Sequence, residues 1–133
     1  MSGSNSAAYE VGEIYRKKGE SEKALQHFTA AIKDRPDFEE AQVGLARALL
    51  QLDQPAQALR HLQQALKLDP ENEVTHYQLS RVYAALGNTA AQTQELQQFR
   101  RLRQIKQSQQ SLLSQGLFQS SDVTRQTLDS DAQ

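Results

Sequence analysis

Two segments of the chain decide its fold, and they read ALQHFTAAIKDRP (residues 24–36) and ALRHLQQALKLDP (residues 58–70). Ala, Leu, His and Pro recur at matching positions, and the two prolines, Pro36 and Pro70, are 34 residues apart. A fixed period of about 20 to 50 residues marks repeat architectures, in which each unit buries its apolar face against its neighbours. The 34-residue period therefore predicts a tandem array of repeated units.

A second helix precedes each of these segments. Small and apolar residues recur there at spacings of three, four and seven, the pattern of a helix with one buried stripe. Turn-forming Gly, Pro, Asp and Asn residues separate the stripes. We therefore expect six helices, over residues 5–18, 21–34, 38–52, 55–68, 72–86 and 89–114. Their expected N-caps include Asp37 with Glu40, Asp53 and Asn88.

The order of residues within one period resembles the tetratricopeptide repeat (TPR). The first copy carries the pattern as Val11, Gly12, Tyr15, Ala24, Phe28, Ala31 and Pro36, and the second as Leu45, Ala46, Leu49, Ala58, Leu62, Ala65 and Pro70. The third keeps Leu79, Ser80, Tyr83 and Leu96 but has Gln92, Phe99 and Gln104 at the remaining positions. The resemblance covers residues 5–104. It implies an all-α fold, a right-handed superhelix (TPR solenoid) of helix-turn-helix repeats.

The domain organisation follows from this alignment. We expect a TPR domain over residues 5–115, with repeats at 5–38, 39–72 and 73–106 and an extended last helix. Residues 1–4 have the composition of a linker or cloning remnant and lack the basic and apolar regions of a signal peptide. Residues 116–133 are rich in Ser, Gln, Asp and Thr, so we expect a polar, disordered tail. The compartment stays open: the cytoplasm is slightly favoured, with a fragment of a larger or exported protein as the alternative.

The bulk composition excludes several classes of function. The 133 residues carry 15 basic and 16 acidic side chains, a net charge of -1, whereas nucleic acids and anionic membranes attract a clear positive excess. The chain has no cysteine, which excludes disulfides and thiolate chemistry. It also lacks a phosphate-binding glycine loop, a nucleophile elbow and a zinc-helix motif. We therefore expect no enzyme activity, no cofactor, no metal, and no nucleic-acid or membrane partner.

Two clusters of polar residues have a simple structural interpretation. His27 and His61 are 34 residues apart, so a solvent-facing position repeated in successive units explains them better than a metal site, and His76 lies on a different helix. The basic run Arg100, Arg101, Arg103 and Lys106 is interpreted as the solvated face of the last helix. A patch for nucleic acid or an acidic partner is the alternative for that run.

The resemblance directs attention to the first helix of each repeat, which lines the concave side in this family. Tyr9, Val43 and Tyr77 share one position on these helices, and Glu13, Arg47 and Arg81 share the position four residues later. Both positions lie opposite the predicted core stripe, so core packing does not account for the tyrosines. Exposed aromatics beside arginines are favoured in recognition surfaces. The alternative is an ordinary amphipathic face with a Glu13–Arg47 salt bridge of little energetic value.

Two classes of function stay open. The first is a non-catalytic scaffold or adaptor whose concave groove binds a peptide or helix of a partner protein. Arg16, Lys17 and Glu40 also lie on this face, and its basic excess favours a partner of acidic character. The second is an assembly module that stacks end-on or forms a homodimer through the last helix, with Phe99, Leu102 and Ile105 as the contact stripe.

One branch of the family holds the C-terminal carboxylate of heat-shock chaperones in a clamp of lysine, asparagine and arginine side chains. The matching positions of this sequence are Tyr9, Glu13, Gly44, Val74 and Gln78. None of them carries a clamp residue. We therefore do not expect a chaperone-carboxylate adaptor.

Overall fold

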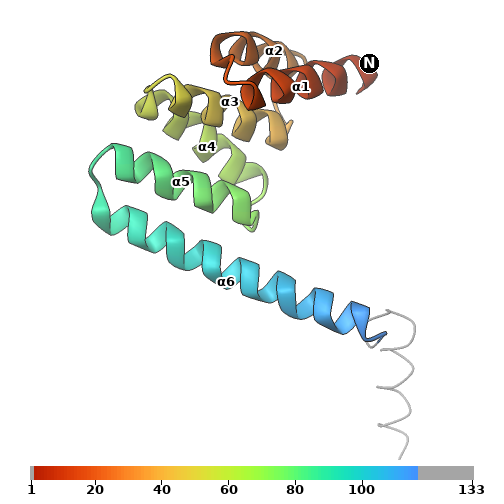
Figure 1. Ribbon diagram of the computed structural model, residues 1–133, viewed down its shortest axis with the longest axis vertical. Coiled ribbons are helices and arrows are strands. Elements are labelled where there is room, and N and C mark those ends of the chain that lie inside the picture. The colour runs from red at the N-terminus through yellow and green to blue at the C-terminus, as the bar shows by residue number, and fades with distance from the viewer. Residues whose placement is uncertain (1, 117–133) are drawn as a thin grey trace, which may run out of the picture. The chain divides into compact units, whose positions relative to one another are not determined.

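The computed structural model describes residues 2–116, which form six helices joined by short turns (Figure 1). The helices are α1 (Ser2–Lys17), α2 (Ser21–Asp34), α3 (Glu39–Gln51), α4 (Pro55–Leu68), α5 (Glu73–Ala85) and α6 (Thr89–Ser114). Helix α1 begins three residues before its expected start, and the other expected bounds agree within one residue. The tail expected over residues 116–133 lies, apart from Gly116, outside the described residues.

The helices pair into hairpins that follow one another along the chain (Figure 1). Within the first two hairpins α1 packs on α2 and α3 packs on α4, while α2 also contacts α3 and α4 contacts α5. Helix α3 contacts both α1 and α5, so these three helices are consecutive neighbours. The chain divides into two compact units, Met1–Phe99 and Arg100–Gln133, and the division falls within α6.

Phe28 explains why the first two repeats need small residues at their crossings. Its ring is fully buried, and it lies against the backbones of α1 and α3. A Cβ atom added at Gly12 or Gly44 would lie only 2.8 or 2.7 Å from this ring, closer than real Cβ contacts allow. The two glycines are thus required by the volume of one phenylalanine, because a close-packed interior has no spare room.

The same position is occupied by a smaller side chain in the later repeats. Leu62 of α4 is fully buried like Phe28, and it belongs to the same apolar cluster as Leu79 and Val82 of α5. Leu96 of α6 is only partly buried. Packing therefore weakens toward the third repeat, after which the described residues contain no further hairpin.

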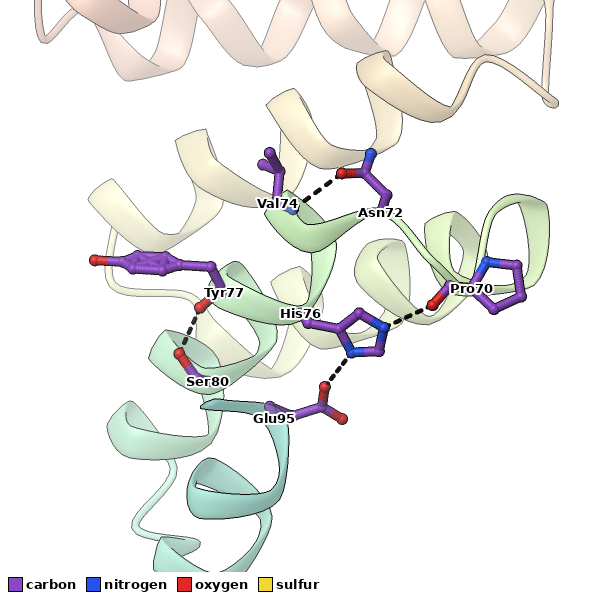
Figure 2. Close-up of polar contacts among 7 residues, drawn as sticks. All are labelled: Pro70, Asn72, Val74, His76, Tyr77, Ser80 and Glu95. Carbon is purple, nitrogen blue, oxygen red and sulfur yellow. Dashed lines mark hydrogen bonds and ion pairs between the residues drawn. The ribbon is translucent and has the colours of Figure 1, made fainter. Parts of the chain in front are cut away.

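Glycine and asparagine residues terminate and start the helices of the third hairpin. Gly87 follows α5 with a φ of +78°, a left-handed conformation that glycine adopts without strain. The side chain of Asn88 accepts a hydrogen bond from the backbone N–H of Ala91, which confirms its predicted capping role. Asn72 caps α5 by accepting from the N–H of Val74 (Figure 2).

Two of the predicted N-caps are wrong. The N-cap residue of α3 is Phe38, and Asp37 instead pairs with Arg35 at 3.2 Å. The N-cap residue of α4 is Gln54, and Asp53 adopts a left-handed conformation with a φ of 59° in the preceding turn. Neither aspartate sits where its carboxylate could receive the free N–H groups of the first helical turn.

Hydrogen bonds recur with the 34-residue period and correct the expectation for the histidines. In the second repeat, Gln42 donates to the carbonyl oxygen of Pro36 at 3.4 Å, and its Oε1 lies 2.9 Å from Nδ1 of His61. In the third repeat, His76 takes the place of Gln42: its Nε2 lies 2.7 Å from the carbonyl oxygen of Pro70 and its Nδ1 2.6 Å from Oε2 of Glu95 (Figure 2).

These histidines are structural groups and are not fully solvent-facing. His76 is buried and His61 is half-buried. Burial, and then the charge of Arg60, lowers the pKa of His61. His27 stacks on Tyr15 at a ring distance of 5.3 Å, because the first repeat has Ala8 where Gln42 and His76 stand. Periodic side-chain hydrogen bonds thus fasten the two helices of the second and third hairpins.

Candidate functional site

The predicted site residues lie on three neighbouring helices. We call the surface that they form the odd-helix face, and it comprises Tyr9 and Glu13 of α1, Val43 and Arg47 of α3, and Tyr77 and Arg81 of α5. Because α3 contacts both α1 and α5, each set of three residues crosses the face as a row. The first row is Tyr9, Val43 and Tyr77, and the second row, one helical turn further along, is Glu13, Arg47 and Arg81.

In the second row, Glu13 pairs with a residue of its own helix, and the Glu13–Arg47 salt bridge of the alternative interpretation is not among the ion pairs of the described residues. Glu13 accepts two hydrogen bonds from Arg16, from Nε and Nη2, each at 2.9 Å. This hydrogen bonding lowers the pKa of the Glu13 carboxyl and raises the pKa of Arg16. Arg16 lies three residues from Glu13 on the same helix, the spacing at which side chains meet. Glu13 is therefore neutralised within α1.

Arg47 is left without a hydrogen-bond partner at a buried atom. Its Nε is enclosed and meets no acceptor among the described residues. Burial is the main cause that lowers the pKa of Arg47, followed by the positive charge of Arg16; Glu13 opposes this effect, and Arg81 lowers the pKa more weakly. The centre of the odd-helix face is therefore a positive position whose charge is not balanced by a dedicated carboxylate.

The first row is more deeply packed than the sequence predicted. The ring of Tyr9 lies 5.2 Å from that of Phe38 and 5.9 Å from that of Phe28, and burial is the main cause that raises the pKa of Tyr9. Val43 is only 6 % exposed and belongs to the apolar core. Core packing therefore accounts for both residues, which corrects the expectation that this row faces away from the core.

Tyr77 differs from the other members of its row. Its side chain is 39 % exposed, although its ring lies 5.1 Å from that of Phe99 on α6. Val74, one turn earlier on α5, is 40 % exposed. The side chains of Tyr77 and His76 point away from one another (Figure 2). The hydrogen bond between α5 and α6 is therefore made by His76 and Glu95, and it does not involve the Tyr77 side chain.

Sequence reasoning missed the roles of Val74 and Phe99 beside Tyr77. Val74 lies three residues before Tyr77, a spacing that places both on one side of a helix. Phe99 stands where Ala31 and Ala65 stand in the earlier repeats. A large ring at a position that is alanine in the first two repeats was the signal that α6 packs against α5 in a different way.

The residues expected to mediate self-association do not form one exposed stripe. Phe99 is partly buried, in contact with Tyr77, and Leu102 is only 6 % exposed. Ile105 is exposed, as are Leu112 and Leu113 further along α6. The exposed apolar residues from Arg100 onward therefore lie nearer the C-terminal end of α6 than predicted.

Two family models described as tetratricopeptide repeat match residues 9–73 and 49–100, so that together they span residues 9–100. The chain belongs to the tetratricopeptide repeat family. The predicted all-α TPR solenoid fold is confirmed, and this fold is generally that of a protein-interaction scaffold. No curated protein sequence matches the chain.

Solved structures of low sequence identity share the fold of the chain. The second TPR of Spaghetti (RPAP3) bound to the HSP90 peptide SRMEEVD has a TM-score of 0.72 at 19% identity, over 74% of this chain and 92% of that chain. The Yersinia enterocolitica type III secretion translocator chaperone SycD, described as an alternative dimer, has a TM-score of 0.76 at 17% identity, over 98% and 96%. The MamA RS-1 double mutant has a TM-score of 0.71 at 20% identity, over 77% and 57%.

These identities establish likeness of fold alone. Among the described residues, no helix combines the length and the apolar character needed to span a membrane.

Proposed function

We propose that the protein is a non-catalytic adaptor that binds a short segment of a partner protein on the odd-helix face. The observation that carries this proposal is the buried Nε of Arg47, which has no acceptor among the residues described. The Arg47 guanidinium is therefore not held by an internal carboxylate, and leaving a buried donor unpaired costs about 1–3 kcal/mol. A partner carboxylate would pair with Nε only by drawing the half-buried Arg47 side chain outward, and it would balance the charges of Arg47 and the exposed Arg81.

The charge balance of the face supports an acidic partner. Glu13 and Arg16 neutralise each other, so Lys17, Arg47 and Arg81 remain against Glu40. An arginine binds a carboxylate through two parallel N–H···O bonds, which fixes both position and orientation. Three repeats offer a small contact area, so we expect an affinity on the order of micromolar, weakening as salt rises.

The chaperone peptide of the Spaghetti (RPAP3) structure is a useful contrast. The clamp positions carry Tyr9, Glu13, Gly44, Val74 and Gln78, and Val43 and Gly44 are buried. No lysine or asparagine is present there to hold a C-terminal carboxylate. We therefore expect the peptide SRMEEVD to bind no better than a scrambled peptide of the same composition.

The proposal is tested by identifying the partner and then comparing matched arginine variants. The partner is first captured with the full chain by crosslinking and mass spectrometry, and its binding segment is then titrated calorimetrically. Arg47→Ala with Arg81→Ala should weaken binding by tenfold or more, because charge-assisted hydrogen bonds are lost. The control is Arg60→Ala on the exposed side of α4, which should bind as the parent does. Loss of binding in the control alone would show that the odd-helix face is not the site.

A homodimer through α6 is a second candidate function. It is favoured by the exposed Ile105, Leu112 and Leu113, since clustered apolar residues at a surface mark contact sites. Light scattering over a wide concentration range should then show a dimer that Leu113→Glu converts to a monomer. A monomer at every concentration, with the variant unchanged in stability, would exclude this second function.

A further inference from the structure

We infer that Tyr77 and Val74 of α5, together with Phe99 of α6, form a docking site for an aromatic side chain flanked by acidic residues in the partner. This inference rests on the proposed function and names the kind of segment that the odd-helix face receives. The three residues are called the end site below. The apolar character of the site comes from the ring pair of Tyr77 and Phe99 and from Val74, which is 40 % exposed. Tyr77 and Phe99 are both more exposed than their counterparts in the second repeat, Val43 and Ala65.

The chain itself shows how an aromatic residue occupies this position. In the first repeat, the ring of Phe38 lies 5.2 Å from that of Tyr9, tilted by 35°. Phe38 is the N-cap residue of α3, so it stands at the boundary between the first and second repeats and closes their junction. It is only 8 % exposed in this arrangement. Tilted ring pairs at such distances stabilise contacts beyond the area they bury.

Among the described residues, Tyr77 is the counterpart of Tyr9 with one ring neighbour instead of two. The residues that follow Phe38 at intervals of 34 are Asn72 and Lys106, and neither is aromatic. Asn72 closes the second junction differently, by hydrogen bonding to Glu39 at the start of α3. Tyr77 keeps 39 % of its surface exposed even with Phe99 beside it. A partner aromatic ring therefore has both the surface and an internal precedent for its placement.

The charges around the two tyrosines define the rest of the segment. Phe38 is flanked by Asp37, Glu39 and Glu40, so the internal precedent is an aromatic residue in an acidic sequence. One turn beyond Tyr77 lies the exposed Arg81, where α1 has Glu13 one turn beyond Tyr9. Acidic residues on both sides of a partner's aromatic residue would therefore meet a more favourable charge at the end site than Phe38 and its acidic neighbours meet beside Tyr9.

A second copy of this chain fits the end site poorly. Among the described residues, the aromatic residue that stands between acidic ones is Phe38, and in a folded copy it is only 8 % exposed and packed against Tyr9. A second copy therefore does not offer this ring to the end site. The occupant is therefore a segment of a different protein, in which an aromatic residue stands between acidic ones.

The test uses the chain's own sequence as a probe. A synthetic peptide of residues 35–42 is titrated into the full isotope-labelled chain, and ring signals are followed by NMR. We expect the signals of Tyr77 and Phe99 to shift and saturate. The peptide with Phe38→Ala should bind about five- to tenfold more weakly, and the peptide with Glu39→Gln and Glu40→Gln severalfold more weakly.

Variants of the chain locate the contact. Tyr77→Ala should weaken peptide binding at least fivefold, whereas Tyr77→Phe, which keeps the ring, should retain it. Melting temperatures of both variants verify that they fold. Arg60→Ala serves as the unaffected control, and the Phe38→Ala peptide tests the ring without altering the chain at all.

The outcomes separate this inference from the proposed function. Shifts at Tyr9 without shifts at Tyr77, equal binding of the Phe38→Ala peptide, or no binding at millimolar peptide would each overturn the end site. If the identified partner then still loses affinity with Arg47→Ala and Arg81→Ala, the odd-helix face remains the site and only the aromatic contact is wrong. If the partner is indifferent to both arginines, the proposed function itself fails.

Discussion

Tyr9 and Tyr77 occupy the same position of the first and third repeats, 68 residues or two periods apart, but they have different surroundings. Tyr9 lies between Phe28 and Phe38 and is part of the packing of the first junction. Among the described residues, Tyr77 has one aromatic neighbour, Phe99, and it is 39 % exposed. One repeat position is thus packed inside the array and exposed where the described hairpins end, and the exposed position is the one that we propose as a contact with a partner.

The largest expected difference between the first and third repeats lies in their cores. Phe28→Ala should destabilise the protein by about 3–5 kcal/mol, because it empties a fully buried site between Gly12 and Gly44. Leu96→Ala, at the matching position of α6, should cost no more than about half as much because Leu96 is only partly buried. Chemical denaturation of both variants measures the difference, and equal losses would remove the graded packing on which the comparison rests.

A smaller contrast is expected at the helix crossings. Gly12→Ala should cost about 1–3 kcal/mol, since its new Cβ would press on the Phe28 ring from 2.8 Å. Ser80→Ala changes the matching position of α5, where it removes a hydrogen bond to the Tyr77 carbonyl oxygen (Figure 2). It should cost about 1 kcal/mol or less. Thermal melts rank the two variants, and a larger loss for Ser80→Ala would contradict the alignment of the repeats.

Substitution of the two tyrosines should lower the free energy of unfolding by different amounts. Tyr9→Ala removes a ring that contacts both Phe28 and Phe38, and we expect a loss of roughly 2–4 kcal/mol. Tyr77→Ala removes one ring contact from a half-exposed site, so its loss should be about 1 kcal/mol. Tyr15→Ala is a useful reference because Tyr15 also has one ring neighbour, His27. Comparable losses at positions 9 and 77 would show that both residues are packing residues.

The smallest expected effect is a pH dependence confined to the second repeat. Burial lowers the pKa of His61 in the folded state, whereas an unfolded histidine titrates near its ordinary value of about 6.5. Below that value the unfolded chain binds a proton that the folded chain resists, so stability falls as the pH drops. His61→Gln keeps a polar group near Gln42 and should reduce the loss of melting temperature between about pH 7.5 and 5. Identical slopes in parent and variant would contradict this assignment.

The period accounts for how much the sequence could predict. Six helices, and their bounds apart from the start of α1, follow from Pro36, Pro70 and the small residues between apolar ones, because each repeat imposes the same local requirements. The surroundings of Tyr9 could not be predicted from its own helix. They depend on Phe38, which lies two helices further along the chain at the N-cap of α3 and which the consensus pattern does not mark. Likewise Glu13 pairs with Arg16 rather than Arg47, since a neighbour on one helix is closer at hand than a neighbour across helices.

A single titration tests most directly whether a ligand binds at the exposed Tyr77, because it can follow all four tyrosines of the chain: Tyr9, Tyr15, Tyr77 and Tyr83. The full chain, labelled only at its tyrosine rings, is titrated with the acid-flanked peptide of residues 35–42 and then with the identified partner segment. We expect the Tyr77 signal to move most, the Tyr9 signal to move little, and the Tyr15 signal to stay fixed beside His27. Movement of Tyr15 or Tyr83 with a stationary Tyr77 would contradict this expectation and place binding away from the odd-helix face.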